Sequence, residues 1–416
     1  MKNLLFTILV FVLFAIPISA QQLELSADLK PRYESKNGFK TLLNDGDEGN
    51  SFVSQRTRFI LNFQQSDFLM KVSVQNVRVW GEVGTLSALD KSSGFHEAWA
   101  QFSVGDYFNL RLGRQEIAYD DQRIFGAADW AQQGRSHDAM IAKFNTGDNG
   151  KLDVGFALNN DSQNGLRNLY SNAAGYKTFQ YVWYHNQFND LGFSLLALNN
   201  GVESQGPNEL EINYSQTFGS RFTYNKNKFS YDASIYFQSG KMGTQSLSAH
   251  YFAGNVKLKA NDEFTVGVGL EYLSGKDMND LSSDIKSFTP LYGTNHKFNG
   301  WMDYFYVGNH ANSVGLIDVN ATFAYKKDKF TAKLIPHFFS SAGDMYNAGA
   351  KISNKLGAEV DFTLGYKVSN AIQFTAGHSQ MYGTKSMEVL KGGISTKSNN
   401  WTWMMLVFRP TLFTSN

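Results

Sequence analysis

Apolar and polar residues alternate along most of this chain with a period of two. This is the pattern of β-strands that have one apolar and one polar face. Leu110 and Leu112, for example, alternate with Asn109 and Arg111. In residues 229–238 one face is almost entirely aromatic or aliphatic and the other is mostly polar. The pattern predicts a protein built from strands, each with one face toward an apolar environment.

The alternating segments number about 18, and each is roughly as long as a tilted strand that crosses a membrane. The predicted strands are residues 23–33, 52–64, 68–82, 95–104, 108–118, 136–144, 151–159, 178–187, 190–199, 210–224, 228–240, 245–259, 263–273, 314–326, 330–340, 355–367, 371–382 and 400–408. An even number of such strands predicts the all-β class and a single antiparallel transmembrane β-barrel that spans residues 21–416.

The connections between these strands are of two kinds. Short turns of two to four residues, such as 225–227 and 327–329, alternate with longer loops. In outer-membrane barrels the short turns are periplasmic and the long loops extracellular, which predicts both termini on the periplasmic side. A barrel of about 18 strands leaves an aqueous channel, whereas about eight strands would be filled by side chains. The alternative, a soluble sandwich or propeller, does not separate loop lengths in this way.

Two long connections carry most of the candidate chemistry. The first follows the strand at 108–118 and is rich in charged residues; the second covers residues 274–313. A loop as long as the second is usually functional or disordered. Its aromatic residues, Trp301 and Tyr304 among them, favour an ordered loop that folds over or into the pore.

Residues 1–20 have the features of a secretory signal peptide. Lys2 supplies the positive charge, an apolar run follows, and small residues precede Gln21. We therefore expect cleavage before Gln21 and a mature chain outside the cytoplasm. A retained anchor helix is the alternative.

Composition adds three constraints. The 416 residues include no cysteine, which excludes disulfides and thiolate metal sites. After the signal segment, no apolar run approaches the roughly 20 residues of a membrane-spanning helix. An aromatic content of 15% with a mean hydropathy of −0.33 fits strands that alternate between lipid and water. The net charge is only +1, so any selectivity must come from where the charges lie.

Several short motifs occur in a fixed order between residues 52 and 303. They are VRVWGE at 77–82, LGRQE at 112–116, DQR at 121–123, DW at 129–130, RSHD at 135–138, LYGTNH at 291–296 and GWMD at 300–303. Together they resemble the alginate export family of outer-membrane barrels. The resemblance implies an 18-stranded barrel with an arginine-rich constriction that conducts an anionic uronate polymer outward.

Two features depart from that family. The turn at residues 368–370 is too short for the periplasmic plug of the alginate exporter, which puts that mode of gating in doubt. The chain also ends in Thr414, Ser415 and Asn416 and not in the terminal aromatic residue usual for these barrels. Because the family is broader than alginate, membership does not fix the substrate.

Basic residues are concentrated on the polar faces of the first third of the barrel. Arginine binds carboxylates through a planar fork, so a series of arginines suits a polyuronate that slides past. Alternatively, these arginines pair with lumenal acids, brace the barrel and leave little net field. The candidate binding residues, pore-lining or in loops, are Arg56, Arg58, Arg78, Trp80, Glu97, Arg111, Arg114, Arg123, Trp130, Arg135, Asp138 and His296.

Aromatic side chains are interpreted in two ways, according to their position in the sequence. Trp80 and Trp130 have polar neighbours and could stack on sugar rings or anchor loops. Aromatic residues near strand ends are interpreted as the interface girdle of a membrane barrel. These are Tyr33, Trp183, Tyr224, Tyr272, Tyr325, Tyr366 and Trp401.

The sequence gives only weak support for a metal site or a catalytic site. For His296 a loop hydrogen bond is favoured over a metal ligand, and no histidine pair has ligand spacing. Ser248 and His250 share a strand face, but no third catalytic partner emerges. We therefore expect no enzyme, no cofactor, no metal and no nucleic-acid partner.

The leading hypothesis is an outer-membrane channel of a Gram-negative bacterium that passes an anionic polysaccharide or its oligosaccharides through an arginine-rich lumen. Its expected partners are the saccharide, outer-membrane lipid and periplasmic secretion or uptake proteins. The first alternative is a general small-solute porin without saccharide selectivity. The second is a binding or structural barrel with a closed lumen.

Overall fold

The computed structural model describes residues 21–415 except 88, 91, 164–167, 171–174 and 207. The predicted signal peptide, residues 1–20, lies outside the described residues, so its cleavage stays a prediction. The described chain begins directly in a strand at Gln21.

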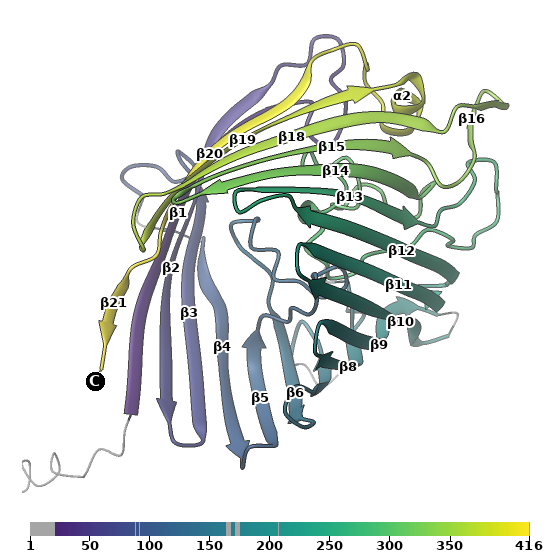
Figure 1. The fold of residues 1–416 in the computed structure, drawn as a ribbon. Helices are drawn as coiled ribbons and strands as arrows, with labels where there is room; N and C mark the ends of the chain where they lie inside the picture. The colour runs from purple at the N-terminus through teal and green to yellow at the C-terminus, as the bar shows by residue number, and fades with distance from the viewer. Residues whose placement is uncertain are drawn as a thin grey trace, which may run out of the picture.

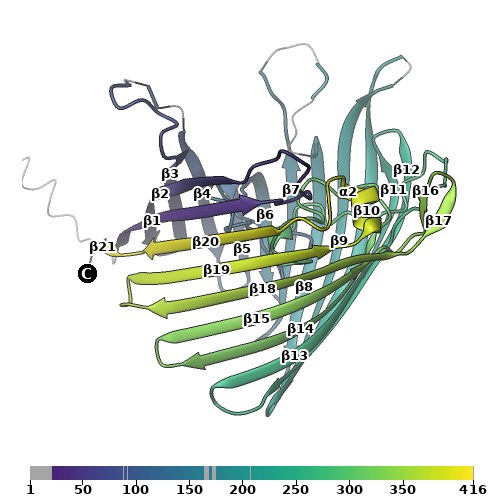
Figure 2. The same ribbon diagram turned by 90° about the horizontal axis from the view of Figure 1, so that it is seen from above.

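The described residues form a closed antiparallel β-barrel (Figures 1 and 2). Its strands are β1 (Gln21–Asn37), β2 (Asn50–Gln65), β3 (Phe68–Val79), β4 (Ser93–Val104), β5 (Phe108–Gln115), β6 (His137–Asn145), β7 (Lys151–Leu158), β8 (Thr178–Phe188), β9 (Leu191–Gln205), β10 (Leu210–Lys226), β11 (Phe229–Met242), β12 (Gln245–Lys259), β13 (Phe264–Leu273), β14 (Leu316–Lys327), β15 (Phe330–Ser340), β18 (Lys355–Lys367), β19 (Ile372–Gly383), β20 (Asn399–Phe408) and β21 (Thr411–Thr414).

The barrel closes because β1 pairs with β2 on one side and with β20 on the other. After a break at Arg409 and Pro410, β21 continues along β1, and Glu24 then pairs with Thr414. Counting β20 and β21 as one interrupted strand gives the predicted total of 18 around the barrel. Closure leaves no edge of the described barrel sheet unpaired, which is the condition for a sheet in lipid.

Little of the described chain is helical. A single 3-10 turn, η1 (Asn295–Lys297), lies in the β13–β14 loop, and α2 (Lys385–Lys391) lies between β19 and β20. A small hairpin of β16 (Met345–Asn347) and β17 (Ala350–Ile352) lies between β15 and β18. Among the described residues, no helix is both long and apolar enough to cross a membrane.

The two ends of the barrel differ in their connections, as predicted. One end has eight tight turns, at residues 66–67, 105–107, 146–150, 189–190, 227–228, 260–263, 328–329 and 368–371. The other end, here called the loop end, has longer connections, except for the short ones at 206–209 and 243–244, where the strands extend further than predicted. Both ends of the described range, Gln21 and Ser415, lie at the tight-turn end, where the Leu23 amide donates to Ser415 Oγ at 2.7 Å (Figure 2).

A belt of exposed apolar side chains surrounds the barrel. Its members face outward from nearly every strand and include Phe59, Val74, Phe102, Leu112, Met140, Val154, Val182, Leu195, Phe218, Phe237, Phe252, Val268, Phe323, Phe338, Phe362 and Met404. Toward the loop end the outward face becomes polar. Asn199 donates to Gln180 and Gln216 donates to Asn199, each at 2.8 Å, across β8, β9 and β10. This amide ladder marks the edge of the belt.

Two loops fold inward and fill the middle of the barrel (Figure 1). They are the β5–β6 loop, residues 116–136, and the β13–β14 loop, residues 274–315. Phe125 of the first forms a β-bridge with Tyr292 of the second, and their rings stack with centroids 5.5 Å apart. Met302 and Tyr304 are completely buried. The expectation that the longer loop is ordered and enters the pore is therefore confirmed.

Two residues assigned to the membrane girdle face the lumen instead. Trp183 stacks on Tyr119 of the β5–β6 loop with centroids 4.4 Å apart. Trp401 is fully buried, and its indole N–H donates to Glu34 at 3.2 Å. The assignment of these two residues was wrong because tryptophan near a strand end can pack against an inward loop as well as against lipid.

The apolar belt predicts a position-dependent response to charge. Val268 is 64% exposed in the middle of the outward face of β13, so Val268→Arg should destabilise the barrel by about 2–4 kcal/mol. The measurement is urea-dependent folding into phospholipid vesicles. Thr265→Arg, on the lumenal face of the same strand, is the control and should have a much smaller effect. Equal losses would contradict the assignment of the belt to lipid.

Candidate functional site

The β5–β6 loop is attached to the barrel wall through Asp129. Arg56 of β2 binds Asp129 Oδ1 through Nη1 and Asp28 of β1 through Nη2, each at 2.6 Å. Lys30 of β1 donates to the Asp129 carbonyl at 2.7 Å, and Arg409 lies 3.7 Å from the Asp129 carboxylate. The strand residues in this group face the lumen because they alternate with outward residues. Asp129 thus binds cations on both sides of the β1–β20 closure.

The charge state of Asp129 follows from these neighbours. Burial alone would raise the pKa of its carboxyl group. The positive charges of Lys30 and Arg56 outweigh burial and hold that pKa below its usual range. The carboxylate is therefore ionised at neutral pH and keeps the loop attached.

The two inward loops are joined to each other by Arg135. Its guanidinium donates to the carbonyls of Tyr292 and Gly293, the latter at 2.8 Å, and the Ala128 amide donates to Thr294 Oγ1 at 3.0 Å. Burial lowers the pKa of Arg135 below its usual value, but a guanidinium keeps its charge in a protein. Arg135 is therefore a cation held by neutral carbonyl groups.

The β13–β14 loop is also attached to β18. The Met302 amide donates to Glu359 at 2.8 Å, and the Trp301 amide donates to Asp361 at 3.2 Å. Gly300 precedes them with a φ of 81°, and a Cβ atom there would lie 2.7 Å from Glu359 Oε2. Glycine is thus required where the loop approaches this wall.

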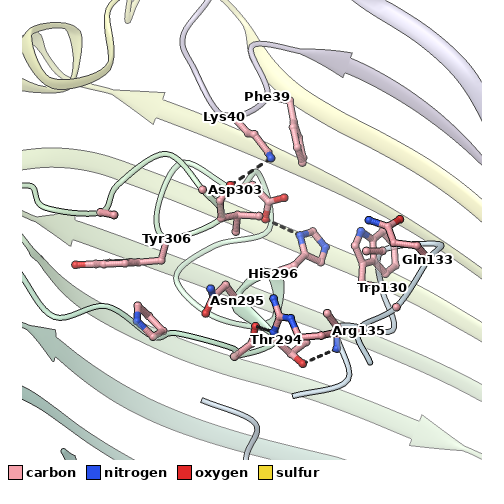
Figure 3. A pocket seen from close by; sticks show the side chains of 18 of the residues that line it. Phe39, Lys40, Trp130, Gln133, Arg135, Thr294, Asn295, His296, Asp303 and Tyr306 are labelled. Carbon is pink, nitrogen blue, oxygen red and sulfur yellow. Dashed lines mark hydrogen bonds and ion pairs between the residues drawn. The ribbon is translucent and has the colours of Figure 1, made fainter. Parts of the chain in front are cut away.

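A cavity of about 670 Å³ lies between β1 and the two inward loops (Figure 3). Its charged lining comprises four basic residues and two acidic ones, namely Arg32, Lys36, Lys40, Arg135, Glu34 and Asp303. Polar side chains of Gln133, Thr294 and Asn295 complete one side of it. We refer to this space as the vestibule. Its shape and mixed polar lining suit a small hydrophilic solute or one unit of a polymer.

Trp130 lines the vestibule but is already occupied by protein groups. The Arg32 guanidinium lies 4.1 Å from the centre of its ring, and His296 stacks on it with centroids 4.8 Å apart. Trp401 and Trp403 contact it edge to face. Trp130 therefore acts as a loop anchor, and little of the ring is free to stack on a sugar.

Two candidate arginines of the wall, Arg58 and Arg111, have no acidic partner in the described part of the chain. Arg58 donates to the Gln75 amide oxygen at 2.7 and 3.1 Å. Arg111 donates to Gln101 at 3.0 Å and stacks over Trp99 at 4.0 Å from the ring centre. No carboxylate oxygen of the described residues lies within 4.0 Å of either guanidinium. These charges are therefore not neutralised by direct ion pairs.

The remaining charged candidates other than Arg78 are paired within the protein, so both interpretations of the arginines hold in part. The pairs are Arg123 with Glu271 at 2.9 Å, Arg114 with Asp138 at 3.1 Å, His296 with Asp303 at 2.6 Å, and Glu97 with Lys71. Arg123 is completely enclosed. Arg114 pairs in register with Asp138 directly after the outward pair Leu112 and Met140, so both side chains lie on the outward face at the loop end of β5 and β6, and their prediction as pore-lining residues was wrong. The loop hydrogen bond expected for His296 is confirmed.

Arg78 and Trp80 do not line the lumen either. Arg78 pairs in register with Gln55, on the face opposite Arg56, and therefore points outward. Trp80 follows at the end of β3, is 60% exposed, and donates to Gln55 Oε1 at 3.0 Å. The prediction of Arg78 as a pore-lining residue was wrong. Near the loop end, β3 carries Val77 and Val79 at lumenal positions and the polar residues Asn76 and Arg78 at outward positions. The polar face of the strand is therefore not the lumenal face there.

Asp28 and Lys30, which hold the Asp129 anchor, were not among the predicted site residues. The signal that could have found them is their position on the polar face of β1. In the β1–β2 register, Asp28 pairs with Arg58 and Lys30 pairs with Arg56. Only the pairing of strands shows that these four residues form one cluster.

One group of potential metal ligands occurs among the described residues. Ligand atoms of His96, Glu97 and Glu116 lie within 4.8 Å of one another. His96 Nε2 already contacts Glu116 at 2.7 Å, and Glu97 is paired with Lys71. These contacts satisfy the cluster without an ion.

The closed barrel, its lipid-facing belt and its partly charged lumen define an outer-membrane β-barrel channel. A family model for alginate export matches residues 21–381, and the chain belongs to that family. A search of curated proteins finds no match. The fold and the family are those of channels.

Solved porins of pseudomonads have a similar fold. The crystal structure of Pseudomonas aeruginosa OccK8 (OprE) is 11% identical, with a TM-score of 0.63 over 94% of this chain and 98% of that chain. Pseudomonas aeruginosa OpdO is 13% identical, with a TM-score of 0.63 over 94% and 98%. A BenF-like porin from Pseudomonas fluorescens Pf-5 is 13% identical, with a TM-score of 0.61 over 94% and 99%.

Replacement of the loop anchor should change both stability and selectivity. Asp129→Ala leaves Lys30 without its acidic partner and Arg56 with only one, so we expect a loss of about 1–3 kcal/mol in urea unfolding. The freed charges should also raise anion selectivity, measured as the reversal potential in a salt gradient. Asp138→Ala is the control, because its exposed pair should contribute no more than about 1 kcal/mol. Unchanged selectivity in Asp129→Ala would argue against the anchor.

Proposed function

We propose that this channel passes an anionic polysaccharide or its oligosaccharides through the lumen. The observation that carries the proposal is that Arg58 and Arg111 lie on the lumenal wall and have no acidic partner among the residues that the structure describes. Membership in the alginate export family supports the same substrate class. The protein then acts in the outer membrane of a Gram-negative bacterium after cleavage of residues 1–20.

The arrangement of charges suits transport better than tight binding. Arg56 and Arg123 are neutralised by acids, so they organise the lumen and add little attraction. Arg58, Arg111 and Arg135 contribute positive potential at separate points. Several weak sites allow a carboxylated chain to enter and to leave, whereas one deep site would trap it.

The vestibule provides the first contact in this proposal. Lys40 and Arg135 attract carboxylates, while Gln133 and Asn295 offer hydrogen bonds to hydroxyl groups (Figure 3). A pore has no direction of its own, so export or uptake depends on the saccharide gradient and on any periplasmic partner.

Single-channel conductance of the purified barrel in a planar bilayer tests the proposal. Polyuronate fragments and neutral oligosaccharides of equal length are added in turn. Block by the polyuronate alone supports an anionic-saccharide channel. An open channel indifferent to both saccharides supports the alternative of a general small-solute porin.

Neutralising the two unpaired wall arginines should weaken that block. Arg58→Gln combined with Arg111→Gln removes two charges but keeps hydrogen-bonding groups, and we expect about tenfold weaker block by oligouronate, or about 1.4 kcal/mol. The anion preference in salt gradients should fall as well. Arg78→Gln is the matched control, because Arg78 faces outward. An effect of the control as large as that of the double variant would contradict a lumenal binding path.

A further inference from the structure

A polar hollow lies on the outer wall of the barrel, directly beyond the apolar belt. On β2 and β3 the outward pair Phe59 and Val74 belongs to the belt, with exposures of 53% and 40%. The next outward pair is Thr57 with Asn76, and the one after it is Gln55 with Arg78. Successive outward pairs are about 7 Å apart along a strand. The outer wall therefore changes from apolar to polar within one such step, at the level of the lipid headgroups.

The hollow has a volume of about 570 Å³ and is built from β2, β3, the first residue of β4 and the β3–β4 loop. Trp80 forms its aromatic side, and Gln55 accepts a hydrogen bond from the Trp80 indole at 3.0 Å. Arg78 donates to Asn76 at 2.7 Å and forms an ion pair with Asp90. The side chains are thus held in place by one another, while Trp80 remains 60% exposed.

This combination of groups suits a sugar ring. An indole face packs against the C–H face of a pyranose, and amide, hydroxyl and carboxylate groups accept or donate to its hydroxyls. The described lining contains one arginine and one aspartate, which are paired, so the hollow has no excess charge. It therefore fits a neutral sugar better than a phosphate or a uronate, and differs from the lumen in this respect.

We propose that this hollow binds a sugar of the glycolipid headgroups that surround the barrel in the outer leaflet. The register places the hollow on the outer wall, so a saccharide in the lumen does not reach it. Its position next to the lipid-facing pair Phe59 and Val74 brings it level with the sugars of a glycolipid whose acyl chains cover the belt. The proposal concerns the outer wall and is independent of the transported solute.

The test uses the full barrel reconstituted in two kinds of vesicle, phosphatidylethanolamine alone and the same lipid with purified lipopolysaccharide. For the wild type, lipopolysaccharide should raise the thermal unfolding midpoint. Trp80→Ala combined with Gln55→Ala should need an about fivefold higher lipopolysaccharide content for the same rise. In phosphatidylethanolamine alone, the double variant should match the wild type. Tyr382→Ala, an outward aromatic residue near the loop end of β19, is the control and should respond to lipopolysaccharide like the wild type.

Three results would overturn the proposal. An equal loss of stability in both vesicle types would make Trp80 an ordinary interface aromatic residue. An unchanged response of the double variant to lipopolysaccharide would exclude the hollow as its binding site. Binding of soluble oligosaccharide that depends on Trp80, with no effect of lipopolysaccharide, would make the ligand a free saccharide. None of these results bears on conductance, so each is distinguishable from failure of the channel proposal.

Discussion

Pairing of every strand edge in lipid is the constraint on which the rest of this structure depends. A backbone group without a partner is costly where no water can reach it, so the sheet must close. Closure comes from β1, which pairs with β2, with β20 and, past the break at Arg409, with β21. Once the sheet is closed, alternation along each strand determines which side chains meet lipid and which enter the lumen.

A barrel of 18 strands is too wide for its own side chains to fill. Here the β5–β6 and β13–β14 loops occupy the space, and each is held by charge. Asp129 lies among the cations Lys30 and Arg56, while Glu359 accepts an amide of the longer loop. The interactions that hold the loops also neutralise much of the lumenal charge. What remains, among the described residues, is a small set of arginines without acidic partners. Their remaining positive charge is the basis of the proposed selectivity.

Charged side chains on the outer and inner walls of the barrel differ in whether they form ion pairs. Inside, Arg111 has no acidic partner within the described ranges and instead contacts an amide and an aromatic ring. On the outer wall beyond the belt, Arg78 is paired with Asp90 and lies beside an exposed tryptophan. An unpaired charge suits a charged solute in transit, whereas a neutral, pre-oriented surface suits a resident sugar.

Much of the fold was determined by the sequence alone, because a period of two needs no tertiary information. The alternation predicted the strands, their number, the two kinds of connection and the lipid-facing belt. The site was only partly predictable. Arg58 and Arg111 were placed correctly on the lumenal face, but which arginines are neutralised depends on contacts between residues far apart in the chain, such as Arg56 with Asp129 and Arg123 with Glu271. Where a strand extends beyond the apolar belt, as at Arg78, its outward face can be polar. The side-chain pattern then no longer identifies the lumenal face, which only the register between neighbouring strands shows.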